Sequence, residues 1–187
     1  LGGIGVTGTY ASNIIAEDAD VVIAIGSRMS DFTTSSKRLF KNPDVKFVTI
    51  NNCRFHAYKM DAAKAVGDAK VTVEALTKKL RARGYVSAYN GEIEEAKKVW
   101  DKEMVRLAGI EYTGDDFEPI IKARDPRTIP EFVKMTNGKI TQTAALAAIR
   151  RVIDEDATII TAGGSLPSCM QRMWTTDKRG GYHAEYG

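Results

Sequence analysis

Two glycine-rich turns are the stretches of this sequence best suited to chemistry, because glycine lets the backbone approach a phosphate closely. The first turn, at 1–13, reads LGGIGVTGTYASN, and Gly3, Gly5 and Gly8 follow the G-x-G-x-x-G spacing of a dinucleotide-binding turn. That motif expects a strand before the turn and an acidic residue at the end of the next strand. The next predicted strand, 21–25, ends in GSR instead. We interpret the first turn as a close approach of backbone to a ligand or partner, with dinucleotide binding as the alternative.

The second turn reads AGGSLP and does follow a predicted strand, at 157–161. It leads into a short predicted helix that ends near Trp174, so the order is strand, glycine turn and helix. Backbone amides at such a helix start can offset phosphate charge. The sequence therefore predicts an anion cradle here, and a tight turn without a ligand remains the alternative.

Two other side chains stand just after predicted strands, where open parallel sheets place their ligands. Arg28 follows the strand at 21–25, where it could anchor the loop or contact a ligand. His56 follows the strand at 45–50, and we interpret it as a surface or capping residue.

The bulk composition is that of an ordinary globular protein, with 43% hydrophobic and 27% charged residues. The net charge of +3 arises from 27 basic and 24 acidic residues that are spread along the chain, which argues against nucleic-acid and membrane-surface binding. No apolar run approaches the roughly 20 residues that span a bilayer. Cys53 and Cys169 lack the spacing of a metal site, and so few cysteines are typical of a reducing, cytoplasmic compartment.

The first half of the chain alternates strands and helices, which predicts an α/β fold with a parallel sheet flanked by helices. The run at 21–25 is continuous and β-branched, so we expect a strand buried on both faces. A short helix is expected through 38–40. A third strand is expected at 65–67, followed by a helix that Asp68 caps and that stops at Gly84.

The second half changes character after Gly84. A charged helix is predicted at 92–107, with a Glu94–Lys98 pair on its surface, and 109–138 has the irregular pattern of a connector. Strand and helix patterns then resume, with Thr141 as a helix cap and a second buried strand at 157–161. The predicted organisation is a partial domain at 1–84, a helical and irregular linker at 85–138, and the start of a second α/β domain at 139–187.

Four phrases resemble, in order and spacing, the central domain of thiamine-diphosphate-dependent enzymes of the acetolactate synthase type. They are GGIGVTGTYASN, ADVVIAIGSRMSDF, VKFVTINN and AVGDAKVTVEALTKKL. The resemblance covers 1–80 and 141–187. It implies a Rossmann-like central domain that is truncated at its N-terminal side, a linker, and the start of the cofactor-binding domain. The chain is accordingly expected to be an inactive fragment of a larger enzyme.

The resemblance also implies the cofactors, thiamine diphosphate and Mg²⁺ in the full-length enzyme. Carried over residue by residue, it assigns diphosphate contact to the second turn, at Gly163, Gly164, Ser165 and Leu166. The resemblance also implies that His183 stands at a position that approaches the cofactor and substrate in relatives. The family's Gly-Asp-Gly metal motif and its activating glutamate have no counterpart here, so we expect no catalytic residue and no metal ligand in the chain. FAD is not expected, because Ile50-Asn51-Asn52 stand where flavin-binding relatives have Asp-Ile-Asp.

The phrases DFTTSSK, TINN and AGGSLPSCMQRMW favour a branch that hydrolyses a carbon–carbon bond of a cyclic 1,2-dione in inositol catabolism. The partners implied are a small cyclic dione substrate and further copies of the same chain in a dimer or tetramer, with no nucleic acid and no membrane. Two alternatives remain open: a piece of an acetolactate synthase-like carboligase, and a nucleotide-binding module without chemistry of its own.

Overall fold

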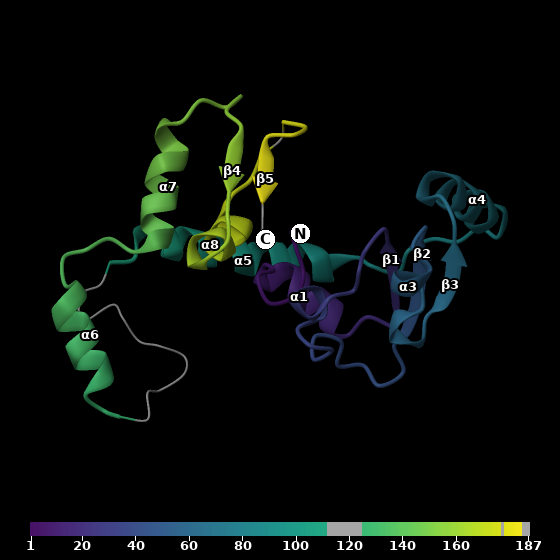
Figure 1. Cartoon of the computed structure of the whole chain (residues 1–187), viewed down its shortest axis with the longest axis horizontal. Coiled ribbons are helices and arrows are strands. Elements are labelled where there is room, and N and C mark those ends of the chain that lie inside the picture. Colours follow the sequence, from purple (N-terminus) through teal and green to yellow (C-terminus); the bar gives the residue numbers. More distant parts are fainter. Residues whose placement is uncertain (112–124, 177, 185–187) are drawn as a thin grey trace. The chain divides into compact units, whose positions relative to one another are not determined.

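The computed structural model of the chain describes residues 1–111, 125–176 and 178–184. The chain divides into two compact units, Leu1–Val99 and Trp100–Gly187, which are described separately below (Figure 1). Both units contain parallel strands with helices beside them, which confirms the predicted α/β class.

The first unit is built on a parallel three-stranded sheet in the order β1-β2-β3, formed by Val21–Ile25, Lys46–Asn51 and Ala63–Val66 (Figure 1). In this register Val21 lies beside Lys46, and Val48 lies beside Ala63. The sheet's helices are α1 (Tyr10–Glu17), α2 (Asp31–Thr34), α3 (Arg54–Ala57), the 3-10 turn η1 (Lys59–Asp61) and α4 (Ala69–Ala82). Helix α5 (Gly91–Gly109) begins in the first unit.

Local chemistry explains where these helices start and stop. The side chain of Asp68 accepts a hydrogen bond from the Val71 amide at 3.0 Å, which confirms the predicted cap of α4. Gly84 follows the end of that helix with a φ of 63°, a conformation that glycine adopts without the steric cost of a Cβ. Thr9 caps α1 in the same way as Asp68, by accepting from the Ser12 amide at 3.1 Å.

The burial predicted for β1 is wrong. Val21, Ile23 and Ile25 are 46%, 46% and 49% exposed, and of the five strand residues Ala24 alone is buried. These three residues alternate along the strand and so point to one face of the sheet, which is partly uncovered, and in the part of the chain that the structure describes β1 is also an edge strand. A continuous apolar run indicates that a strand is suited to burial on both faces, but the elements packed around the strand determine whether its side chains are buried.

The short helix predicted through 38–40 is also misplaced. The helix in this region is α2, which begins earlier because Ser30 caps it, accepting from the Thr33 amide at 3.4 Å. Three successive residues with positive φ, Ser35, Ser36 and Lys37, then end it. Non-glycine residues rarely adopt this conformation, so the sequence alone gave no signal for it.

The second unit contains α6 (Thr128–Thr136), α7 (Gln142–Val152), β4 (Ile159–Thr161), α8 (Ser165–Met173) and β5 (Tyr182–Ala184) (Figure 1). Strands β4 and β5 are parallel, with Ile159 beside Tyr182. Helix α7 packs against α8, and Leu146, Met170 and Met173 are buried. Thr141 caps α7 as predicted, accepting from the Ala144 amide at 3.1 Å. Strand β4 is shorter than predicted and is not fully buried, because Ile160 is 77% exposed.

The predicted connector at 109–138 includes α6, and its stretch 112–124 lies outside the described residues. Within the described ranges, no helix is both long and apolar enough to cross a membrane.

Candidate functional site

The first glycine turn is held together by its own hydrogen bonds. The Gly5 amide donates to the Asn13 side-chain oxygen at 2.8 Å, and the Asn13 side-chain nitrogen donates to the Gly5 carbonyl at 3.0 Å. Three more amides donate to backbone carbonyls: Val6 to Phe32 at 2.8 Å, Gly8 to Gly5 at 3.0 Å, and Thr9 to Gly3 at 2.9 Å. A phosphate cradle needs unpaired amides that point at the ligand, and these four are already paired.

The glycines of this turn are explained by packing instead. A Cβ at Gly5 would lie 1.9 Å from the Phe32 carbonyl oxygen, and a Cβ at Gly8 would lie 2.5 Å from that of Gly3. Backbone therefore approaches backbone at both positions, which only a residue without a side chain permits. The G-x-G-x-x-G spacing here marks a tight structural turn.

The carboxyl edge of the first sheet is braced by Asn51, which is 6% exposed. Its side-chain nitrogen donates to the Ser27 carbonyl at 3.0 Å, and its side-chain oxygen accepts from the Cys53 amide at 2.9 Å. Lys59 donates to the Arg28 carbonyl at 3.0 Å, so the Arg28 backbone is anchored while its side chain is exposed. Asn51 thus joins the ends of two strands and has the role of a structural brace.

A basic and aromatic cluster next to this edge was missed by the sequence reasoning. Arg54, Phe55, Tyr58 and Lys59 line an open hollow of about 450 Å³. Lys59 lies 5.4 Å from the centre of the Phe55 ring, and Arg54 lies 5.9 Å from that of Tyr58, which are cation–π distances. The alternation of basic and aromatic residues in RFHAYK is the signal that could have found it. His56 lies within this segment, and its Nδ1 is buried without a hydrogen-bond partner.

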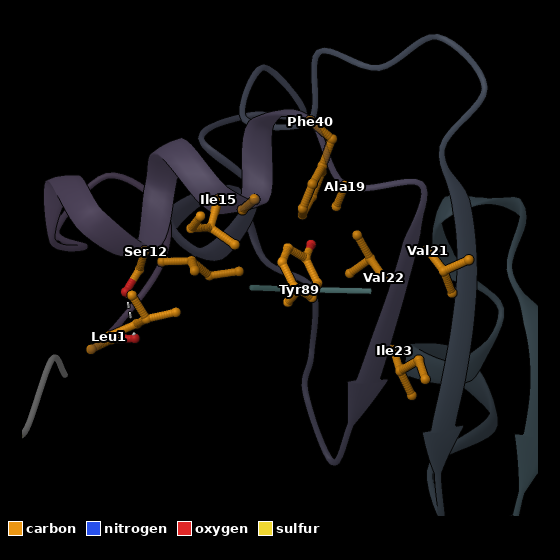
Figure 2. A pocket seen from close by; sticks show the side chains of 12 residues that line it. Leu1, Ser12, Ile15, Ala19, Val21, Val22, Ile23, Phe40 and Tyr89 are labelled. Atoms are coloured by element: carbon orange, nitrogen blue, oxygen red, sulfur yellow. Dashed lines mark hydrogen bonds between the residues drawn. The ribbon is translucent and has the colours of Figure 1, made fainter. Parts of the chain in front are cut away.

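A second hollow of about 280 Å³ lies between α1 and the edge strand β1 (Figure 2). Its lining is largely apolar and includes Ile15, Val22 and Phe40. Figure 2 shows the Tyr89 ring among these side chains, although Tyr89 is far from them in sequence. No periodic pattern around Tyr89 predicted this contact.

The second glycine turn has the opposite character to the first, because it is open. Gly163 and Gly164 are exposed, and a Cβ built on either would meet nothing within 4 Å. Gly164 has a φ of 123° and is the residue before α8, where no side chain caps the helix. The first amides of a helix have no partner within it, so those of α8 face this open turn. All four residues predicted for diphosphate contact lie together here.

Neighbouring polar side chains extend this turn into a polar site. Ser165, the first residue of α8, accepts a hydrogen bond from Gln142 Nε2 at 3.2 Å. The Cys169 thiol, which is half-buried, donates to Gln142 Oε1 at 3.5 Å. Thr161, at the end of β4, is 9% exposed, and its hydroxyl oxygen is buried without a partner. Its sequence position immediately precedes the turn.

His183 is exposed on β5, and its Nε2 lies 2.9 Å from the Gly180 carbonyl oxygen. Within the described residues, no group of three or more His, Cys, Asp or Glu side chains is arranged to hold a metal ion.

The ionisable groups with shifted pKa values lie on or near other helices. A hydrogen bond from Arg106 lowers the pKa of Glu103 on α5, and one from Arg127 lowers the pKa of Asp125 before α6. The Asn90 amide lowers the pKa of Glu92 by donating to its carboxylate. These groups stabilise helices and are not part of the turn.

Comparison with known proteins shows which proteins the chain resembles. Residues 1–76 match the family model described as the central domain of thiamine pyrophosphate enzymes. The chain is 57% identical over 187 residues to a 3D-(3,5/4)-trihydroxycyclohexane-1,2-dione hydrolase of Clostridium botulinum and 57% identical to one of Clostridium perfringens. It is 49% identical to hydrolase 2 of the same name from Bacillus cereus. Each match covers 100% of this chain, and the chain spans 29% of the relative's length.

Proposed function

We propose that this chain, which belongs to the thiamine pyrophosphate enzyme family, is part of a hydrolase that cleaves a carbon–carbon bond of a cyclic 1,2-dione in inositol catabolism. The observation that carries the proposal is 57% identity along the whole chain to hydrolases named for trihydroxycyclohexane-1,2-dione. The identity extends beyond the 76 residues of the family model and therefore includes the second unit.

The second glycine turn fits the diphosphate of the cofactor. Gly163 and Gly164 leave space where a side chain would block the approach of a phosphate, and the start of α8 offers unpaired amides and a positive dipole end. Ser165 adds a hydroxyl, and Leu166 continues the helix start. We assign diphosphate contact to these four residues. When bound, thiamine diphosphate supplies a nucleophilic carbon and an electron sink.

This chain's own contribution is to bind and orient. The turn residues neutralise phosphate charge, while Asn51 and the first glycine turn support the central domain. We place no catalytic residue and no metal ligand in the chain, and we expect the full-length enzyme to take Mg²⁺ through residues elsewhere. Asn51 already bonds to the protein through both its side-chain oxygen and its side-chain nitrogen, and it has no carboxylate to accept from ribose hydroxyls, which supports the expectation that FAD is absent.

The partners that we propose follow from the same similarity to the hydrolases. The substrate is a small cyclic dione, and the full-length enzyme forms a homo-oligomer, a dimer or a tetramer. The spread of 27 basic and 24 acidic residues supports an enzyme that binds neither nucleic acid nor membranes, and the presence of only two cysteines supports a cytoplasmic location.

The test uses the full-length enzyme that contains this chain. Hydrolysis of trihydroxycyclohexane-1,2-dione is measured with and without thiamine diphosphate and Mg²⁺, and pyruvate is assayed alongside as the substrate of a carboligase. We expect cofactor-dependent hydrolysis of the dione and no acetolactate. Acetolactate formation without dione hydrolysis would instead place the enzyme with the carboligases.

A variant connects this activity to the turn. Gly164→Val places a branched side chain where φ is 123° and where we expect the diphosphate. We expect the Kd for thiamine diphosphate to rise at least about tenfold, the scale of one lost hydrogen bond to a charged group. An unchanged Kd in a folded variant would remove the cofactor from this turn.

A further inference from the structure

We propose that Gln142 is a positioning residue that directs the hydroxyl proton of Ser165 toward the cofactor's diphosphate. The inference rests on the proposed function and concerns a residue that lies 23 positions before Ser165 in the sequence. Gln142 is the first residue of α7 and Ser165 is the first residue of α8, so the packing of these two helices brings their starts together.

The direction of the hydrogen bond decides what the serine can do. A hydroxyl has one proton to donate and two lone pairs to accept with, whereas an amide nitrogen can only donate. Gln142 Nε2 lies 3.2 Å from Ser165 Oγ, so the serine oxygen must be the acceptor in this contact. The hydroxyl proton is therefore left for another acceptor.

The orientation of the Gln142 amide is fixed from its other end. The Cys169 thiol donates to Gln142 Oε1 at 3.5 Å, one turn along α8 from Ser165. Reversing the amide would leave its NH₂ group facing the thiol sulfur, which is a weak acceptor, and would lose the bond from the thiol to the amide oxygen. The thiol contact therefore favours the orientation in which the amide donates to the serine.

Ser165 is not consumed by helix capping. The residue before α8 is Gly164, which has no side chain, and Ser165 itself is the first helical position. Both Ser165 and Gln142 are exposed at the open turn. A diphosphate is an acceptor without protons to give at neutral pH, so it matches a serine held as a donor, and such charge-assisted bonds are the stronger kind.

The test measures the Kd for thiamine diphosphate of the full-length enzyme at saturating Mg²⁺, by calorimetry. Ser165→Ala removes the hydroxyl, and we expect the Kd to rise about tenfold. Gln142→Glu keeps the shape but turns the donor into an acceptor. The serine proton should then turn toward the carboxylate, and the Kd should rise at least as much as in Ser165→Ala. Gln142→Met removes both hydrogen bonds and leaves the hydroxyl free to rotate, so its Kd should rise by a smaller factor.

Two controls separate positioning from structure. Gln171→Glu makes the same charge change farther along α8, and its Kd should stay within about twofold of wild type, because its charge is more distant and screened. The double variant Gln142→Met with Ser165→Ala should bind no more weakly than Ser165→Ala alone, because Gln142 acts through the serine. All variants should keep the wild-type melting temperature within the error of the measurement.

The outcomes distinguish this inference from the proposed function. Wild-type enzyme that fails to bind thiamine diphosphate would overturn both. Wild-type affinity in Gln142→Glu, or additive losses in the double variant, would overturn the positioning role and leave the cofactor assignment in place. Wild-type affinity in Ser165→Ala, together with weakened binding in Gly164→Val, would also overturn the inference alone.

Discussion

At the scale of single residues, two turns of similar glycine-rich composition have different structures, one closed by backbone packing and the other open. In the first turn, amides donate to carbonyls of the protein and to Asn13, and the glycines allow backbones to touch. In the second, Gly163 and Gly164 face open space. The difference lies in where the backbone hydrogen bonds go, and motif spacing carries no information about that.

Substitution of Gly8 tests the structural role of the first turn. A Cβ in Gly8→Ala would lie 2.5 Å from the Gly3 carbonyl oxygen, and backbone cannot move aside as a flexible side chain could. We expect the free energy of unfolding to fall by about 1–3 kcal/mol, the usual cost of overpacking. Urea unfolding of the chain, followed by circular dichroism, measures it.

Gly67→Ala is the matched control for Gly8→Ala. Gly67 lies in the same unit, and its Cβ would meet its nearest neighbour, Thr72 Oγ1, at an ordinary 3.8 Å. Its urea midpoint should stay close to wild type. Equal midpoints for the two variants would show that the first turn tolerates a side chain, and the packing explanation would then fail.

Some residue-level predictions succeeded because they depend on local chemistry. Asp68 and Thr141 cap their helices as predicted, since a cap needs only its own side chain and the amides that follow. The predicted Glu94–Lys98 pair is wrong in its partner, because Glu94 lies 3.8 Å from Lys97. Residues three and four positions along a helix both face Glu94, so rotamers decide between them.

At the scale of elements, strand positions were predicted closely and strand burial was not. Continuous β-branched runs located β1 fully and β2 to within a residue, because such runs favour extended backbone wherever they stand. Burial depends on which elements lie beside a strand, and β1 is an edge in the described structure. The second glycine turn was located from its place after a strand, and its contact with the cofactor stays a prediction. Gln142 was missed because its contact with Ser165 is non-local.

The edge strand has a consequence for the isolated chain. Val21, Ile23 and Ile25 expose apolar side chains along an edge whose backbone groups can pair with another strand. We expect the chain to self-associate as its concentration rises, and Ile23→Lys to reduce this association by placing a charge on the edge. Light scattering across a concentration series measures both.

Val71→Lys is the control for the edge variant. Val71 is 65% exposed on α4, away from the strand edge, so a lysine there adds the same charge without blocking strand pairing. Its self-association should resemble that of the wild type. A monomeric wild-type chain over the whole series would contradict the open edge, and an equal effect of both lysines would mean that net charge is responsible.

At the scale of the whole molecule, the described structure contains two compact units, and the chain spans 29% of the length of its relatives. The predicted division at 84 and 138 stays a prediction. The proposed activity needs an activating carboxylate and metal ligands that we place outside this chain. In our proposal the second unit supplies one side of the diphosphate site, through the second glycine turn and the starts of α7 and α8.

The last prediction follows from that division of roles. We propose that the diphosphate is bound by the turn at Gly163 and Gly164 together with a metal whose ligands lie outside this chain. A helix start alone stabilises a bound anion by only about 1 kcal/mol. The isolated chain should therefore show no heat of binding when thiamine diphosphate is titrated in with Mg²⁺, whereas the full-length enzyme should bind it. A parallel titration of the isolated chain that carries Gly164→Val provides the reference for non-specific heat. Micromolar binding by the isolated wild-type chain that Gly164→Val abolishes would mean that the chain holds a complete cofactor site, and the proposed placement of the metal ligands outside it would be wrong.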